Sequence, residues 1–418
     1  MFEAAVACLV ITALLEYLNH RLVGLPTTIG MLVGAMLLSL TLVALDWAGL
    51  GALHAYETEV LQSLDFSKLL LDGMLSMLLF AGALHIDLSL LRAYRWQVAA
   101  LALVGTLVST AIVGFGLFWL LPPLGLFLPL TWCLVFGALI SPTDPIAVIG
   151  ILKNAGVSQD LSVVVSGESL FNDGVGVVLF ALLVGVASSE HTPTAAEATM
   201  LLLREAGGGV LLGGLLGWML FVLLRSIDNY KVEVLLTLAG VLGGYELAHR
   251  LHVSGPLAMV VTGVIIGNHG RALAMSDTTR HHVDLFWSLI DDILNALLFV
   301  LLGLEIIVVE LNADVVVAVI VVPFLALLAR VMAVGLPVAT LRGWFKLPPH
   351  AWRILTWGGL RGGISVALAL SLPLGGPRDL LLALTYSVVV FSILVQGLSM
   401  RTLVRRSMAQ ARRSLDPR

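Results

Sequence analysis

Long apolar runs follow one another along the whole chain, separated by short polar segments. About 13 runs can be delimited, and most have the ~20 residues that an α-helix needs to cross the hydrocarbon core of a bilayer. The pattern therefore predicts an all-α integral membrane protein with about 13 transmembrane helices. The expected spans are residues 2–18, 27–45, 68–87, 97–121, 129–150, 160–187, 200–225, 232–250, 256–268, 283–309, 313–341, 350–373 and 379–403.

Composition and charge exclude several other classes of protein. Hydrophobic residues make up 59% of the chain, charged residues make up 12%, and the mean hydropathy is +1.02, far from the balance of a soluble domain. The formal net charge is −4, and no basic region with interleaved aromatic residues indicates nucleic-acid binding. The two cysteines, Cys8 and Cys133, lie in separate spans and predict neither a metal cluster nor a disulfide.

One transmembrane domain is expected over residues 1–403, with no soluble linker or domain inside it. It divides into a first half (1–187), a connecting helix (200–225) and a second half (232–403). A short basic cytoplasmic tail (404–418) follows, and contact with lipid head groups is its expected use.

Positive charges are distributed unevenly between the loops on the two sides of the predicted membrane. Most of the 23 lysine and arginine residues fall in one alternating set of loops and in the C-terminal tail. The acidic and small-residue loops at 46–65 and 188–197 fall on the opposite side. Because cytoplasmic loops carry the excess of Lys and Arg, the N-terminus is expected outside and the C-terminus in the cytoplasm of a cell-membrane protein.

Two carboxylates, Glu168 and Asp173, interrupt the apolar sixth span. At helical spacing Ser169 and Asp173 share one face, and Glu168 and Asn172 form the adjacent ridge about 100° round the helix. A carboxylate at the centre of a bilayer costs about 3 kcal/mol, so such residues usually face the bundle interior and mark ion or proton paths. The sequence therefore predicts an intramembrane ion site on this helix.

The fifth span, 129–150, contains the strongest helix-breaking signal. Pro142 and Pro145 each remove a backbone donor and clash with the preceding turn, so the helix is expected to open around Thr143 and Asp144. Irregular backbone at membrane depth is tolerated where it is buried or lines a wet cavity, and its freed carbonyls can bind a cation. Asp144 would supply negative charge beside those carbonyls.

The twelfth span, 350–373, carries a second break with different residues. Four glycines surround Arg361 in the middle of the apolar run. Counting spans 1–6 and 8–13 as two halves makes the fifth and twelfth spans correspond, and this order alone predicts an inverted repeat with two discontinuous crossing helices. An unpaired guanidinium at that depth would be costly, and Glu168 is the predicted partner of Arg361.

Three of these segments together resemble the monovalent cation/proton antiporter family, in its NhaP/NHE-like branch. They are Ser141-Pro-Thr-Asp-Pro-Ile-Ala-Val148, Gly167-Glu-Ser-Leu-Phe-Asn-Asp-Gly174 and Gly358-Gly-Leu-Arg-Gly-Gly-Ile-Ser365. Residues 78–88 and 297–305 also look like family segments, so the resemblance covers most of the chain. The resemblance implies 13 helices in an inverted repeat, a homodimer, and exchange of Na⁺ (or K⁺ or Li⁺) for H⁺ by an elevator-like movement, with a part in sodium and pH homeostasis.

The resemblance also assigns roles by motif position. Asp173 would bind either the cation or the proton, and Asp144, the Ser169 hydroxyl and the Thr143 backbone carbonyl would complete the oxygen shell of Na⁺. Glu168 and Arg361 would form a supporting ion pair, with Asn172 orienting the site. The Asn172–Asp173 sequence resembles the electroneutral branch of the family, which implies one cation per proton. No cofactor is expected beyond the transported ions, and membrane lipids are the other expected partner.

Several further residues fall into a second tier. Glu305 lies deep in the tenth span, where an ion pair with Arg330 is one interpretation, and Asp292 lies with Asp291 toward the predicted cytoplasmic entrance. Many relatives carry an acidic residue near the position of Ala81, and its absence prevents the transfer of any role for that carboxylate. His85 and Asp87 are interpreted as a solvated pair at a helix end.

Other functions fit the same residues less well. A K⁺/H⁺ antiporter would use the same site, because selectivity among monovalent cations depends on ligand distances that motifs do not specify. A cation channel could use the same polar helices, but it would need no proton coupling. An intramembrane hydrolase would need a nucleophile and a base within reach, and no such constellation occurs in the spans, so the chain is not expected to be an enzyme.

Overall fold

The structure is a computed structural model in which every regular element of the described residues is helical. It describes residues 2–47, 73–154, 157–188, 195–305, 313–340, 351–373, 375 and 377–415. Within these ranges there is no β-strand, and the one β-type contact is an isolated bridge between Asp144 and Leu360. The prediction of an all-α protein is confirmed.

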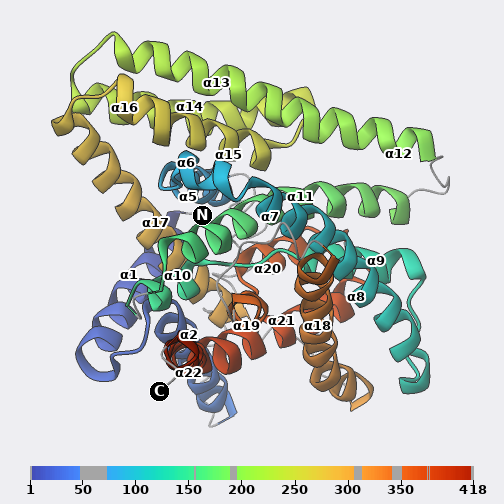
Figure 1. Cartoon of the computed structure of the whole chain (residues 1–418). Coiled ribbons are helices and arrows are strands. Elements are labelled where there is room, and N and C mark those ends of the chain that lie inside the picture. The colour runs from blue at the N-terminus through green and yellow to red at the C-terminus, as the bar shows by residue number, and fades with distance from the viewer. Residues whose placement is uncertain are drawn as a thin grey trace.

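The helices keep the numbering used in Figure 1. The α-helices are α1 Phe2–Leu18, α2 Thr27–Trp47, α5 Leu75–Leu84, α6 Leu88–Ala93, α7 Arg95–Ala99, α8 Thr106–Leu120, α9 Leu130–Ile140, α10 Ile146–Asn154, α11 Gln159–Ser188, α12 Ala195–Leu202, α13 Gly208–Arg225, α14 Tyr230–Leu251, α15 Gly255–Ile265, α16 Arg271–Leu273, α17 Asp277–Glu305, α18 Ala313–Thr340, α19 Ala351–Trp357, α20 Gly363–Leu370, α21 Arg378–Phe391 and α22 Leu398–Leu415. Short π-helical or 3₁₀ turns join some of them: η1 Asn19–Val23, η3 Ala100–Gly105, η4 Pro122–Leu124, η5 Leu203–Gly207, η6 Ile266–Gly270 and η8 Ser392–Gly397.

Among the described residues, 9 helical stretches are long and apolar enough to cross a membrane. They are Ala5–Val23, Thr27–Leu45, Arg95–Leu124, Gln159–Ser188, Met200–Arg225, Tyr230–Leu251, Asp277–Leu304, Val315–Thr340 and Arg378–Met408. Each overlaps a span expected from the sequence. The remaining expected spans correspond to α5, to α9 with α10, to α15, and to α19 with α20, all of which are short or interrupted.

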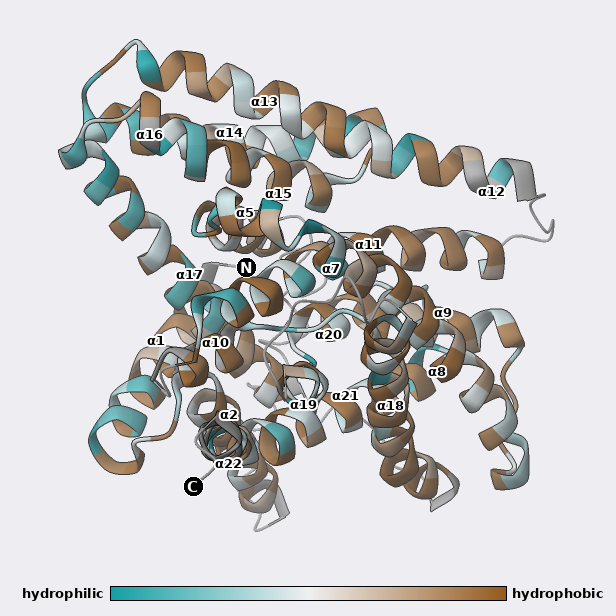
Figure 2. Cartoon of the chain, viewed as in Figure 1, coloured by the Kyte–Doolittle hydropathy of each residue, from teal (hydrophilic) through white to brown (hydrophobic). Residues whose placement is uncertain are grey.

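Hydropathy varies between the elements as membrane burial requires. Figure 2 shows apolar residues over most of α13 and α18, whereas hydrophilic residues gather around α16 and the first turns of α17. Large apolar side chains such as Leu211 and Leu215 on α13 and Ile320 and Phe324 on α18 are exposed on the chain itself. Exposed apolar stripes of this length are expected where a helix faces lipid.

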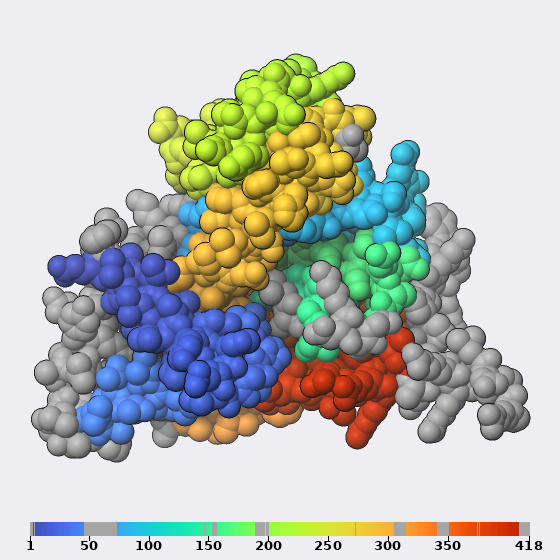
Figure 3. Space-filling view, turned by 90° about the vertical axis from the view of Figure 1, so that its left-hand side faces the viewer, coloured from blue at the N-terminus to red at the C-terminus, as the bar shows by residue number. Residues whose placement is uncertain are grey.

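The helices form two packed regions that α17 connects. In Figure 1, α13, α14 and α15 make a layer at the top of the view, and α17 runs from α16 down toward α1 and α2. Figure 3, turned by 90°, shows the gold residues of α17 descending from the yellow-green layer to the blue N-terminal helices. The buried side chains agree, because Trp287 belongs to the cluster with α5 and α13–α15, and Phe299 belongs to the cluster with α1 and α2.

α11 lies where three of the buried clusters meet. Leu170 packs in the cluster with α5 and α13–α15, and Val164 packs in the cluster with α10, α19 and α22. Phe180, further along the same helix, packs in the cluster with α8, α9 and α18. The polar motif of α11 is therefore held from several sides by well-packed helices.

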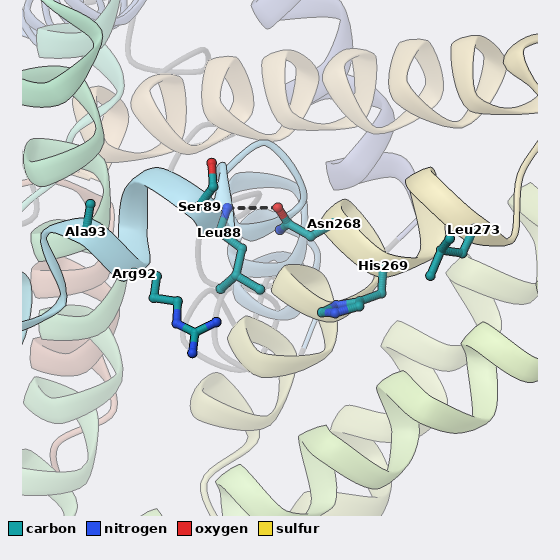
Figure 4. A pocket seen from close by; sticks show the side chains of 7 residues that line it. All are labelled: Leu88, Ser89, Arg92, Ala93, Asn268, His269 and Leu273. Carbon is teal, nitrogen blue, oxygen red and sulfur yellow. Dashed lines mark hydrogen bonds between the residues drawn. The ribbon is translucent and has the colours of Figure 1, made fainter.

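The turn between α5 and α6 is held in place by Asn268 of η6 (Figure 4). Its side-chain oxygen accepts the backbone N–H of Leu88 at 2.8 Å, and its Nδ2 donates to the carbonyl of Ile86 at 2.9 Å. Leu88 and Asn268 line a groove that also includes Arg92 and His269. This groove adjoins Asp87 and Leu90, which line a deeper cavity.

Candidate functional site

The first helix break occurs where the two prolines predict it. α9 ends at Ile140 and α10 begins at Ile146, so Ser141 through Pro145 lie outside both helices. In this break the Asp144 backbone N–H donates to the carbonyl of Leu360 at 2.7 Å. Backbone from the first break is therefore bonded directly to backbone from the second.

The second break separates α19, which ends at Trp357, from α20, which begins at Gly363. Its glycines allow a close approach, because a Cβ added at Gly362 would lie 2.6 Å from Asp144 Oδ2 and 2.8 Å from Asp144 Cβ. The carboxylate of Asp144 thus sits against the residue that caps the N-terminus of α20. A negative charge there interacts favourably with the free N–H groups and the positive dipole end of that helix.

Asn172 of α11 ties the first break to the polar motif. Its Oδ1 accepts the Thr143 backbone N–H at 3.2 Å, and its Nδ2 donates to Thr143 Oγ1 at 2.8 Å and to Glu168 Oε1 at 3.1 Å. The Thr143 and Ser169 hydroxyls share a further hydrogen bond of 3.0 Å. All four side chains are buried, so this network gives the break one defined position on α11.

Asp173 lies one helical turn after Ser169 and is only 5% exposed. Its Oδ1 has no hydrogen-bond partner in the described part of the structure. Gly176, three residues on, is in contact with Pro142, so α11 runs directly against the first break at this level. Leaving a buried polar oxygen without a partner costs about 1–3 kcal/mol, and such an oxygen calls for a functional explanation.

A cavity of about 550 Å³ contains the Asp173 side chain together with Thr143 and Asp144. It is lined by parts of α5, α6, α10, α11, α17 and α20 and by both breaks. Its lining extends to His85 and Asp87 at the end of α5 and to Gln159 at the start of α11. The cavity therefore extends from the buried carboxylates to the exposed residues His85 and Asp87.

The ion pair beside the site differs from the one that the sequence predicts. Arg330 of α18 holds Glu168 with two hydrogen bonds, Nη1 to Oε1 at 2.6 Å and Nη2 to Oε2 at 2.8 Å. The prediction that Glu168 pairs with Arg361 is therefore wrong. Which of two buried arginines reaches a glutamate depends on how distant helices pack, and helical spacing within one span carries no such information.

Arg361 instead binds the end of α9. Its Nη1 donates to the carbonyls of Ser141 at 2.6 Å and Pro142 at 3.0 Å, and its backbone N–H donates to Ser392 Oγ at 2.8 Å. These carbonyls belong to the end of an interrupted helix, where backbone acceptors lack partners and the helix dipole is negative. Arg330 binds the end of α19 in the same way, because its Nε and Nη2 donate to the carbonyl of Leu355 in the last turn of that helix.

The second-tier residues divide between the cavity and other places. Asp291 lines the cavity and its Oδ1 accepts from Asn295 Nδ2 at 3.1 Å, whereas Asp292 is exposed and is not among the lining residues. α17 ends at Glu305, whose side chain falls outside the described residues. His85 and Asp87, interpreted from the sequence as a solvated pair, both line the cavity where it opens.

Many secondary transporters bind their substrates beside interrupted helices, and the described residues place the buried carboxylate of Asp173 beside two such helices. The sequence model of the family described as sodium/hydrogen exchanger, transmembrane, matches residues 7–406. The chain belongs to this family, and it is a multi-pass membrane protein.

Relatives and solved structures agree with this assignment. The chain is 50% identical over 410 residues to the Na⁺/H⁺ antiporter NhaP of Pseudomonas aeruginosa, covering 97% of each chain. It is 36% identical over 398 residues to the Na⁺/H⁺ antiporter NhaH of Halobacillus dabanensis, covering 92% of this chain and 93% of that one. Its fold matches the sodium proton antiporter MjNhaP1 of Methanocaldococcus jannaschii with a TM-score of 0.76 at 19% identity, covering 96% and 97% of the two chains. These relatives are transporters, in agreement with the expectation that the chain is not an enzyme.

Proposed function

We propose that this protein exchanges Na⁺ for H⁺ across the cell membrane, with Asp173 as the group that binds the two ions in turn. The observation that carries the proposal is the buried Oδ1 of Asp173. This atom has no hydrogen-bond partner in the described residues, and the Asp173 side chain lines the cavity. A carboxylate removed from water gains most by binding one positive charge, either a proton or a metal cation. Occupation by one ion then excludes the other, and the two fluxes are coupled without a separate proton path.

The oxygen atoms around Asp173 suit a hard monovalent cation. Asp144, the Ser169 hydroxyl and the Thr143 backbone carbonyl are the further ligands in this proposal. Support comes from the 3.0 Å hydrogen bond between the Thr143 and Ser169 hydroxyls, which gathers two of these ligands on one side of the site. Charged and neutral oxygens are the ligands that hard cations prefer in proteins. Li⁺ or K⁺ would use the same atoms, with rates that depend on the fit of each ion.

The proposed stoichiometry is one Na⁺ for one H⁺ in each transport cycle. Glu168 is neutralised by Arg330 through two short hydrogen bonds, and Asn172, beside Asp173, carries no charge. Asp144 lies against the N-terminus of α20, which offsets its charge. Asp173 is then the one carboxylate of the site whose charge changes, and exchange is electroneutral.

The proposed movement carries both helix breaks and α11 together. The Asp144–Leu360 backbone bond and the Asn172 network join these segments, so that an elevator-like displacement would move them as one body. With the N-terminus outside and the C-terminus in the cytoplasm, the cavity faces the cytoplasm in this state. The proposal includes a single transmembrane domain over residues 1–403 in an inverted repeat, and a homodimer, as the family resemblance implies.

Reconstituted protein provides the test. Proteoliposomes with an internal pH dye should show proton movement on addition of Na⁺, and parallel additions of Li⁺ and K⁺ should rank the cations. Asp173→Asn should abolish the signal. A neutral amide does not take up a proton in this pH range, so it cannot exchange a proton for a cation. Glu246→Gln, at an exposed carboxylate that pairs with Arg250 on α14, is the matched control and should exchange normally.

Three outcomes would overturn parts of the proposal. Cation flux without proton movement would identify a channel. A rate that changes when the membrane potential is clamped would contradict the electroneutral stoichiometry, while full exchange by Asp173→Asn would remove Asp173 from the site.

A further inference from the structure

Ser365 is a buried hydroxyl that no role described so far explains. It is the third residue of α20, it is 1% exposed, and it lines the same cavity as Asp173 and Asp144. Its Oγ has no hydrogen-bond partner in the described part of the structure. An unpaired buried hydroxyl costs about 1–3 kcal/mol, so its presence in the cavity requires a reason.

The position of Ser365 beside the second break explains why it lacks a partner. Several buried hydroxyls inside other helices donate to a carbonyl one turn earlier, as Thr106 donates to Ala102 at 2.6 Å and Thr385 donates to Leu381 at 2.6 Å. For Ser365 the carbonyls one turn earlier precede the helix. Gly362 has an extended backbone, with φ −125° and ψ −159°, and cannot present its carbonyl as a helical residue would.

The same position places the Ser365 hydroxyl at the N-terminal end of α20. In the first turn of a helix, the side chain of the third residue lies beside the residue that caps the N-terminus. For α20 the cap is Gly362, against which the Asp144 carboxylate packs. Ser365 and Asp144 line the same cavity, and Ser365 reaches it from the second break, whereas Thr143 and Ser169 belong to the first break and to α11.

We propose that Ser365 Oγ is a further ligand of the transported cation and completes its oxygen shell from the side of the second break. This inference rests on the proposed function of Asp173. A hydroxyl binds Na⁺ through a lone pair and has no part in holding the exchanged proton on the carboxylate. Loss of Ser365 therefore weakens cation binding and leaves proton binding at Asp173 in place.

The test is a set of substitutions measured by Na⁺-dependent proton flux in proteoliposomes. Ser365→Ala should raise the KM for Na⁺ about tenfold, as expected for the loss of one interaction with a charged group, and should leave kcat within about twofold. Ser365→Cys keeps the approximate size but replaces oxygen with a soft sulfur atom, and it should raise KM similarly. Ser365→Thr, which retains a hydroxyl, should restore a KM close to that of the native protein.

A matched control lies at the other end of α20. The Ser371 hydroxyl already donates to the carbonyl of Leu368 at 2.7 Å, so Ser371→Ala should leave the KM for Na⁺ unchanged. The pH dependence of exchange at saturating Na⁺ should be the same in Ser365→Ala and the native protein, because proton binding is unaffected. Thermal melting of each purified variant in detergent shows whether it is folded.

The outcomes separate this inference from the function on which it rests. An unchanged KM in Ser365→Ala, with Asp173→Asn inactive, overturns the role of Ser365 alone. A raised KM in Ser365→Ala but not in Ser365→Cys shows that packing is responsible, and this also overturns it. Full exchange by Asp173→Asn would refute the proposed function itself.

Discussion

The break between α9 and α10 and the break between α19 and α20 are opened by different residues. Pro142 opens the first because it has no backbone N–H to donate to a carbonyl of α9, and Pro145 stands just before α10. Glycines open the second, and the absence of a side chain at Gly362 lets the Asp144 carboxylate approach the backbone. The first break therefore supplies acceptors and a negative charge, and the second supplies space and a positive charge from Arg361.

Because of this difference, each break supplies hydrogen-bond partners that the other one lacks. Arg361 of the second break donates to the Ser141 and Pro142 carbonyls of the first, and Asp144 of the first donates to Leu360 of the second. Buried charges and backbone groups need partners at membrane depth, and here the two breaks satisfy each other. A substitution in one break is therefore expected to act through the other.

The largest effect is expected from removing the arginine that caps α19. Arg330→Met leaves Glu168 buried without its counterion and should destabilise the protein by about 3–5 kcal/mol. Thermal melting in detergent measures the loss. The double variant Glu168→Leu with Arg330→Met removes both charges and should recover most of the stability, and a double variant as unstable as Arg330→Met would contradict the ion-pair explanation.

A smaller effect is expected at the contact between the breaks. Gly362→Ala places a Cβ against the Asp144 carboxylate, so one segment must shift, at a cost of about 1–3 kcal/mol. The variant should lose most of its Na⁺-dependent exchange even where it remains folded, because the displaced Asp144 carboxylate belongs to the proposed site. Gly335→Ala on α18, where an added Cβ meets nothing within 4 Å, is the control and should be neutral. Equal behaviour of the two alanine variants would refute the close approach.

The smallest effect is expected at Pro145. This residue precedes the first turn of α10, where a missing N–H is one of the donors that has no helical partner in any case. Pro145→Ala should therefore change stability by less than about 1 kcal/mol and leave the break open, held by Arg361 and the Asp144–Leu360 bond. Melting and exchange assays check this. A loss larger than that of Gly362→Ala would show that the proline itself maintains the break.

The sequence was sufficient to locate both breaks and the polar face of α11, because each depends on local backbone chemistry. Proline and glycine act on their own turn of helix, and Ser169 and Asp173 share a face through helical spacing alone. The partner of Glu168 depends on how α18 is placed relative to α11, which no local pattern reports. The choice of Asp291 over Asp292 as a cavity residue likewise depends on how α17 is rotated about its axis.

Ser365 could have been noticed in the sequence only as a polar residue near glycines. Its significance depends on the extended backbone of Gly362, which removes the acceptor that a serine inside a continuous helix would use. The lengths of the interrupted spans raise the same difficulty. Residues 129–150 and 350–373 read as single apolar runs, and the lengths of the two short helices in each run depend in part on the backbone bond between Asp144 and Leu360, which joins the two breaks.

The ion pair between α11 and α18 also has a consequence for biosynthesis. Glu168 and Arg330 are separated by 162 residues. At a synthesis rate of about 5–20 residues per second, the arginine emerges from the ribosome roughly 8–30 s after the glutamate. During this interval the insertion machinery must accept a helix whose carboxyl group has no counterion. Premature termination before α18 would leave α11 with a carboxyl group that lacks its counterion.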